Sequence, residues 1–267
     1  MISPRRFFVS LAALLILTMV FSACDKQRDP AQLSDDEQIV YYTDQINKTG
    51  DWYAFYNRGQ AYYRKQQYDL AIADYTQAIE RSYTGRNASI NMERTIRRRA
   101  DAFNNRGNAY DQKGQYDLAF IDYNKAVELN PSDPYPYNNR GIIFDKKGEY
   151  DLAIADYTKA IEIDPKDPNA YNNRGNSYNH KNQYDLAIAD CTTAIEIAPA
   201  FEKPYINRGN AYAGKRQYDL AIADYTKAIE LDPKSAAAYN NRGLVYKAQG
   251  QYDLAKADFD KAELNKH

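Results

Sequence analysis

The chain has 267 residues, and its 35 Lys and Arg residues nearly balance its 36 Asp and Glu residues, for a formal net charge of −1. A chain so close to neutral gives no electrostatic reason to expect a nucleic-acid partner. Its two cysteines and two histidines stand in no metal-ligand, redox or catalytic motif, so the sequence predicts no enzyme activity, no metal site and no cofactor.

The N-terminal segment predicts export. It reads MISPRRFFVSLAALLILTMVFSAC, in which two arginines precede 17 uncharged residues, 7–23. A basic start followed by an apolar run is typical of a secretory signal peptide, which we assign to residues 1–23. The residues around Cys24 resemble the lipobox of bacterial lipoproteins, where a cysteine after two small residues is lipidated and becomes the mature N-terminus, although Leu is usual where Phe21 stands. We therefore expect lipidation of Cys24, with an uncleaved membrane anchor and a soluble secreted protein as the alternatives.

This resemblance implies that the mature protein is anchored by lipid to a bacterial membrane and faces the periplasm or the exterior. Asp25 resembles the inner-membrane retention signal of enteric bacteria. Sorting rules differ between bacteria, so the inner and the outer membrane both stay open. Residues 24–33 are polar and form a predicted tether. Ser34 and Glu37 then have the spacing of a capping box, which predicts a helix over 34–49 that caps the first repeat.

A repeated string organises the rest of the chain. The residues NRG occur six times, and from Gly107 onward their glycines are 34 residues apart, whereas the first gap, from Gly59, is 48 residues. A fixed period of this size indicates stacked supersecondary units rather than one globular core. With the glycine as position 8, the repeats span 52–85, 100–133, 134–167, 168–201, 202–235 and 236–267, and residues 86–99 form an insertion.

Each repeat has the pattern of two helices. Positions 4 and 11 are aromatic, positions 20 and 27 are Ala, and position 24 is aromatic except for Cys191. Positions 4, 8 and 11 share one helix face, and positions 20, 24 and 27 share a second. The small residues let the two helices approach, and the aromatic rings fill the space around them. Proline at position 32 of the four middle repeats ends the second helix.

Over residues 52–267, the insertion apart, this pattern resembles the tetratricopeptide repeat family. The resemblance implies an all-α fold, a right-handed α-solenoid superhelix of six helix-turn-helix repeats. It says little about function, because a fold hosts many functions.

One departure from the family is systematic. Position 7, where the family usually has Leu, is Arg in every repeat, and position 23 is always Asp. Both positions lie at the edge of an apolar face, where a charge needs a partner. We predict a structural ladder of ion pairs between the two helices, with arginines that bind an acidic ligand as the alternative. The ladder comprises Arg58, Arg106, Arg140, Arg174, Arg208 and Arg242 with Asp74, Asp122, Asp156, Asp190, Asp224 and Asp258.

Asparagine occupies position 6 of every repeat and position 9 of several. Position 6 lies nearly opposite the apolar face of the first helix, and in the family this side of the first helices lines the concave groove that binds ligands. A carboxamide offers both a donor and an acceptor, so a row of them can pair with an extended peptide backbone. The predicted peptide-groove residues are Asn57, Asn105, Asn108, Asn139, Asn173, Asn176, Asn207, Asn210 and Asn241. The alternative is a polar, solvated face that recent duplication has copied.

The insertion is basic and carries a single acid, Glu93. We expect it to add turns to the front of the next helix. Its arginines either form a solvated face or contact anionic lipid headgroups or an acidic partner. This basic patch comprises Arg86, Arg94, Arg97, Arg98 and Arg99.

Taken together, these features favour a non-enzymatic, lipid-anchored scaffold or adaptor. Its expected partners are extended segments of other proteins, bound in the groove on the extracytoplasmic side of a bacterial membrane. The alternative is a structural oligomerisation protein, a homo-oligomer in which each groove is occupied by a neighbouring copy.

Overall fold

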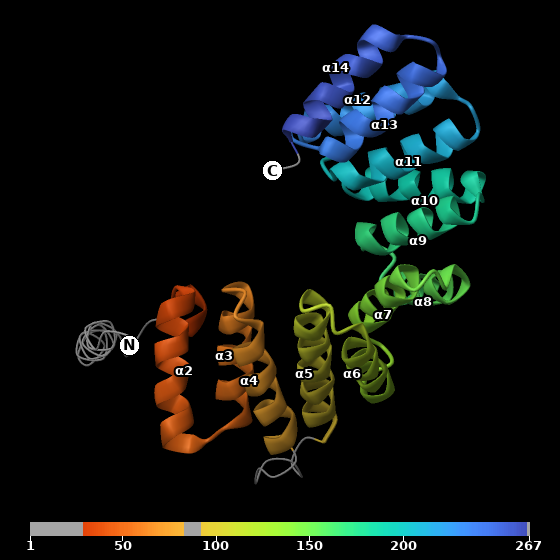
Figure 1. Cartoon of the computed structure of the whole chain (residues 1–267). Helices are drawn as coiled ribbons and strands as arrows, with labels where there is room; N and C mark the ends of the chain where they lie inside the picture. The colour runs from red at the N-terminus through yellow and green to blue at the C-terminus, as the bar shows by residue number, and fades with distance from the viewer. Residues whose placement is uncertain (1–28, 83–91, 266–267) are drawn as a thin grey trace, which may run out of the picture. The chain divides into compact units, whose positions relative to one another are not determined.

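The computed structural model describes residues 29–82 and 92–265, and within these ranges the chain is built from helices and contains no strand (Figure 1). A short 3-10 turn, η1 (Pro30–Gln32), comes first. The predicted all-α fold of consecutive helix pairs is confirmed. The helices are α2 (Asp35–Thr49), α3 (Trp52–Arg64), α4 (Tyr68–Arg81), α5 (Met92–Gln112), α6 (Tyr116–Leu129), α7 (Pro134–Lys146), α8 (Tyr150–Ile163), α9 (Pro168–His180), α10 (Tyr184–Ile197), α11 (Glu202–Gly214), α12 (Tyr218–Leu231), α13 (Ala236–Ala248) and α14 (Tyr252–Leu264).

The helices form two compact units, one ending at Leu129 and one beginning at Asn130. In the first unit α2 packs on α3, α3 on α4, α4 on α5 and α5 on α6. In the second unit the same order of neighbours runs from α7 to α14. Odd-numbered helices from α3 to α13 are therefore the first helices of the repeats, and even-numbered helices from α4 to α14 are the second helices.

The helix ends follow from local chemistry. The helices α6, α8, α10 and α12 each stop two residues before the proline at position 32, because proline cannot donate the next helical hydrogen bond. The aspartates Asp133 and Asp167 then accept hydrogen bonds from the backbone N–H groups of Tyr135 and Asn169 at the start of the next first helix. These caps satisfy donors that the first turn of a helix leaves open.

Close packing inside each repeat depends on the glycine at position 8. A Cβ atom on Gly141 would lie 2.6 Å from Cε1 of Tyr157, and one on Gly209 would lie 2.7 Å from Cε1 of Tyr225. These distances are far below ordinary van der Waals contact, so the two helices can approach this closely only because no side chain is present. The tyrosine rings are fully buried beneath them.

Helix α2 begins after Ser34, and both hydrogen bonds of the capping box are present. The backbone N–H of Ser34 donates to Oε2 of Glu37 over 2.8 Å, and Glu37 N donates to Ser34 Oγ over 3.4 Å. The helix ends at Thr49, and the left-handed φ of 60° at the next residue, Gly50, lets the chain turn into α3. Helix α5 begins at Met92 and so extends eight residues ahead of position 1 of its repeat, Ala100.

The predicted signal peptide, Cys24 and most of the predicted tether lie outside the described residues, as does Arg86 of the basic patch. Within residues 29–82 and 92–265, no helix combines the length and the apolar character that a membrane span requires.

Candidate functional site

The arginine at position 7 and the aspartate at position 23 meet in every repeat. In the first repeat Arg58 donates from Nε to Oδ2 of Asp74 over 2.7 Å and from Nη2 to Oδ1 over 2.7 Å. The other five pairs have the same bidentate geometry, with every distance 2.7 or 2.8 Å. Two parallel charge-assisted bonds give both strength and a fixed orientation.

These pairs are largely removed from water. The arginine side chains are 16–19% exposed and the aspartate side chains 3–10% exposed. The hydrogen bonds to Asp74 raise the pKa of the Arg58 guanidinium above its ordinary value. Burial raises the pKa of the Asp122 carboxyl, although its bonds to Arg106 act in the opposite direction.

A threonine of the preceding second helix, or of α2 in the case of Arg58, completes five of the six arginine sites, whereas Asn124 stands at the equivalent position before Arg140. The Nη1 group of Arg174 donates to Oγ1 of Thr158 over 3.0 Å, and the same bond joins Arg106 to Thr76, Arg208 to Thr192 and Arg242 to Thr226. In these repeats, and in the first, Nε, Nη1 and Nη2 of the arginine are therefore all bonded within the fold. This arrangement favours the structural interpretation of the arginines over a site for an acidic ligand. Sequence reasoning missed the threonines, although the recurring string DLAIADYT ends in Thr76, Thr158 and Thr226, and DLAIADCT ends in Thr192.

The asparagines at position 6 link consecutive first helices. The Nδ2 group of Asn105 donates to the Tyr56 hydroxyl over 2.9 Å, that of Asn173 to Oδ1 of Asn138 over 3.1 Å, that of Asn207 to Oδ1 of Asn172 over 2.9 Å and that of Asn241 to Oδ1 of Asn210 over 2.9 Å. In each case the acceptor belongs to the preceding first helix. All of these position-6 asparagines are half-buried, so one amide proton of each holds the array together at its surface.

Two asparagines at position 9 hold buried tyrosines. The Tyr123 hydroxyl donates to Oδ1 of Asn108 over 2.9 Å, and the Tyr225 hydroxyl donates to Oδ1 of Asn210 over 2.8 Å. Burial raises the pKa of both tyrosines above its ordinary value. Position 9 therefore supports the core of its own repeat as well as facing the first-helix surface. The two remaining predicted groove residues of the second unit, Asn139 on α7 and Asn176 on α9, are half-buried.

A small hollow lies between α3 and α5 in the first unit. Its volume is about 180 Å³, and it is lined by Gln60, Tyr63, Arg64, Tyr75, Asn105 and Asn108. Two of the predicted groove asparagines thus border one concave site, together with the tyrosine that packs beneath the glycine of the first repeat. The lining offers amide, hydroxyl and guanidinium groups at one place, which suits a polar backbone more than an apolar side chain.

The arginines of the basic patch that the structure describes have two different environments. Arg94 and Arg97 are exposed at the front of α5, and Nη2 of Arg97 pairs with Oε1 of Glu93 over 2.7 Å. Arg98 lies 5.0 Å from the centre of the Trp52 ring, and Arg99 lies 5.5 Å from that of Phe103. Such contacts are attractive cation–π interactions. Trp52 belongs to α3, so Arg98 helps to attach the extended front of α5 to its neighbour, whereas Phe103 lies on α5 itself and the Arg99 contact stays within that helix.

Comparison with known families gives repeated matches along the chain. Sequence models of the tetratricopeptide repeat match residues 52–82, 100–133 and 168–201, and a second model of that description matches residues 122–155. A model described as TPR repeat matches residues 143–180 and 209–250. These segments together span more than half of the chain. The comparison with curated proteins gives no match.

Solved structures with similar folds agree with these matches. MamA is 26% identical, with a TM-score of 0.52, over 60% of this chain and 93% of that one. YrrB is 21% identical, with a TM-score of 0.54, over 74% of this chain and 95% of that one. The Cut9–Hcn1 complex of the APC/C has a TM-score of 0.72 at 17% identity, over 96% of this chain and 50% of that one. At identities of 21% and 17%, the likeness to YrrB and to the Cut9–Hcn1 complex shows only that their fold resembles that of this chain. On the family matches, the chain belongs to the tetratricopeptide repeat family.

Proposed function

We propose that the protein is a non-enzymatic adaptor that binds extended segments of partner proteins along the surface of its first helices. The observation that carries this proposal is the row of asparagine amides on consecutive first helices. Asn105 and Asn207 each use one amide proton for the preceding helix. The second proton and the oxygen of each carboxamide remain as donor and acceptor for a peptide backbone.

The spacing of this row suits an extended ligand. Neighbouring packed helices lie about 10 Å apart, and an extended chain advances about 3.3 Å per residue. One asparagine therefore meets the backbone at about every third residue of a bound segment. The hollow between α3 and α5 gives such a segment a site where Asn105 and Asn108 approach it together. YrrB, which shares the fold, is a tetratricopeptide repeat protein with an unusual peptide-binding site.

The N-terminal sequence supports a membrane location for this adaptor. In our proposal Cys24 carries a lipid that holds the array on the extracytoplasmic side of a bacterial membrane. A tether of this kind raises the local concentration of membrane partners, so weak contacts of the groove become useful. With Cys24 lipidated, the second cysteine of the sequence, Cys191, has no partner for a disulfide within the chain, and its side chain is buried in the fold.

Cross-linking in membranes tests the adaptor function. Wild-type protein and the variant Asn173→Ala/Asn207→Ala/Asn241→Ala are cross-linked to their neighbours and purified. We expect the wild type to capture partner segments on its first helices and the variant to lose them. Equal capture by both proteins would place binding on another surface. Light scattering over a range of concentrations separates the alternative, because a self-filled groove predicts an oligomer that dissociates on dilution.

A further inference from the structure

Helix α2 matches the second helices of the repeats in register. Its Thr43 accepts from Nη1 of Arg58 over 3.0 Å, as Thr158 accepts from Arg174. Its Asp36 pairs with Lys65, the residue directly after α3, as Asp151 pairs with Lys181 and Asp185 with Lys215. The helix therefore fills the place of the second helix of a preceding repeat, although residues 34–49 do not continue the 34-residue string.

Within the described residues, no first helix accompanies this preceding half-repeat. Tyr42 stands directly before Thr43, as Tyr157 stands directly before Thr158. Tyr157 is covered by Gly141 of its own first helix. In the described part of the chain, by contrast, only the 3-10 turn η1 precedes α2. Among residues 29–82 and 92–265, helix α2 is thus a second helix without a paired first helix.

A cleft of about 960 Å³ lies at this place. One wall is formed by Gln38, Tyr42 and Gln45 of α2, and the other by Tyr53, Asn57 and Arg64 of α3. A helix about 10 Å wide with a rise of 1.5 Å per residue fills roughly 120 Å³ per residue. The cleft therefore has room for about two turns of helix.

The amide row ends at this cleft. The position-6 asparagines that donate to the preceding first helix are Asn105, Asn173, Asn207 and Asn241. The Nδ2 group of Asn57 instead donates to the carbonyl of Tyr53 in its own helix, over 2.7 Å. Asn57 lines the cleft. A helix placed there would offer Asn57 the acceptor that Asn172 offers to Asn207.

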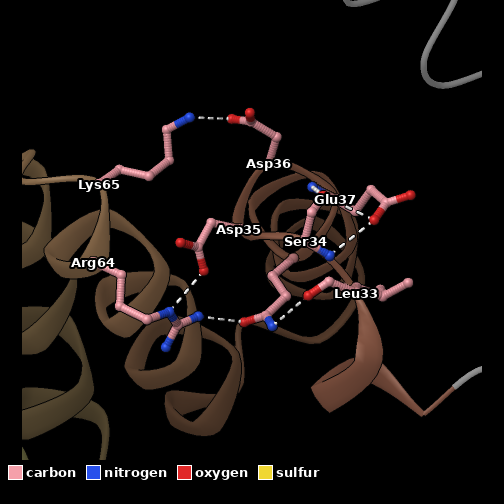
Figure 2. Close-up of polar contacts among 8 residues, drawn as sticks. Leu33, Ser34, Asp35, Asp36, Glu37, Arg64 and Lys65 are labelled. Carbon is pink, nitrogen blue, oxygen red and sulfur yellow. Dashed lines mark hydrogen bonds and ion pairs between the residues drawn. The ribbon is translucent and has the colours of Figure 1, made fainter.

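The walls are held in position without an occupant (Figure 2). Nε of Arg64 donates to Oδ1 of Asp35 over 2.7 Å and its Nη2 donates to Oε1 of Gln38 over 2.7 Å. Nζ of Lys65 pairs with Oδ1 of Asp36 over 2.6 Å, and Gln38 donates to the Leu33 carbonyl over 2.9 Å. A cleft with fixed walls costs little ordering on binding.

The charge of the lining selects among occupants. Three carboxylates, those of Asp29, Asp35 and Asp51, line the cleft against one guanidinium, that of Arg64. This excess of negative charge favours a basic ligand. The leucine-rich run of residues 7–23 carries no charge and so does not complement this polar, acidic lining.

We propose that the cleft receives an amphipathic helix of a partner protein, net positive in charge, with a small residue over Tyr42 and an amide or hydroxyl acceptor facing Asn57. The docked helix supplies the missing first helix and completes a seventh helix pair. This site shares Asn57 with the predicted groove, but it stands whether or not extended segments bind elsewhere on the first helices.

The probe is a labelled peptide of residues 236–248, AAAYNNRGLVYKA, which is itself a first helix with a central glycine and two positive charges, Arg242 and Lys247. It is titrated against the full-length protein to about millimolar concentration and followed by fluorescence anisotropy, because short isolated helices are only partly formed. We expect saturable binding that Asn57→Ala weakens about fivefold, through one lost hydrogen bond. The matched control, Asn47→Ala, removes the same kind of side chain from an exposed position of α2 that does not line the cleft, and should leave binding unchanged.

A second peptide carries Gly243→Leu. We expect it to bind at least tenfold more weakly, because in its own repeat a Cβ on Gly243 would lie 2.8 Å from Phe259. Leucine favours helix over glycine, so reduced helicity cannot explain the loss. Absence of binding, equal binding of the two peptides, or equal effects of Asn57→Ala and Asn47→Ala would each overturn the proposal. A stable dimer that excludes the peptide would also overturn it, because a second copy would then be the occupant.

Discussion

The guanidinium of Arg174 and the carboxylate of Asp190 join the two helices of one repeat through two parallel hydrogen bonds, 2.7 Å from Nε to Oδ2 and 2.8 Å from Nη2 to Oδ1. The two side chains are 17% and 10% exposed. Each charge is therefore held away from water by the same contact that neutralises it, and this geometry recurs in all six repeats.

Removing one member of this pair should strand the other. We expect Arg174→Leu and Asp190→Ala each to lower the free energy of unfolding by about 2–4 kcal/mol, because either change leaves a largely buried charge without its partner. The double variant Arg174→Leu/Asp190→Leu should recover most of this loss, since apolar packing can replace a buried ion pair. Urea unfolding of all three variants measures the coupling. Losses that simply add in the double variant would contradict the pairing.

The contact between Arg208 and Thr192 predicts a link between successive repeats. Thr192→Val keeps the shape of the side chain but removes the acceptor for Nη1 of Arg208. We expect a loss of about 1 kcal/mol in the free energy of unfolding, the usual net value of one hydrogen bond. Thr193→Val is the matched control, because the next residue of the same helix bonds only the carbonyl of Ala189. Similar stability of the two variants would show that the threonine contributes nothing to repeat coupling.

A half-buried carboxylate, that of Asp145, should make the stability of the fold depend on pH. Asp145 accepts from the hydroxyls of Tyr157 and Ser177, over 2.9 and 2.7 Å, and burial raises the pKa of its carboxyl. Between the ordinary pKa of an aspartate and this raised value, the folded state binds more protons than the unfolded state. The contribution of Asp145 to stability must therefore fall as pH rises through that window.

Asp145→Asn should remove this part of the pH dependence. We expect the urea midpoint of the wild type to fall, relative to that of the variant, as pH rises from 4 upward through the window. The exposed residue Asp260 provides the control, Asp260→Asn, which should follow the wild type. Parallel curves for the wild type and Asp145→Asn would show that the Asp145 carboxyl makes no such contribution to the pH dependence.

The helical framework was predictable because it depends on residues close together in the repeat. The prolines at position 32 mark the ends of the second helices, and the glycine at position 8 marks the contact with Tyr157 and its equivalents. Contacts between repeats were harder to predict. The bond from Arg174 to Thr158 joins residues that no single-helix pattern relates, and its meaning appears only when two repeats are stacked.

The relation of α2 to the repeats was hidden for a second reason. Thr43 stands 15 residues before Arg58, whereas Thr158 stands 16 residues before Arg174. Helix α2 runs one residue further past its threonine than α8 does, but the turn into α3 is two residues shorter than the turn into α9. The net difference of one residue removes α2 from the 34-residue period, so the sequence suggested a capping helix but not half of a repeat. The contacts of the asparagines were also beyond sequence-based prediction. The helical wheel placed position 6 away from the core, but it could not show that the side-chain amide reaches the preceding first helix.

The last prediction concerns what the first-helix surface recognises in a ligand. Replacing Asn173, Asn207 and Asn241 together by Ala should weaken a bound segment by roughly 2–4 kcal/mol, at about 1 kcal/mol for each lost hydrogen bond. The same change also removes three bonds between first helices, so the unfolding free energy should fall too, and binding has to be measured well below the unfolding temperature of the variant. Because an amide pairs with the backbone, N-methylation of the ligand should reduce affinity more than scrambling of its side chains. A ligand that tolerates N-methylation but not scrambling would be recognised through side-chain pockets, and the asparagines would then act only in holding one repeat to the next.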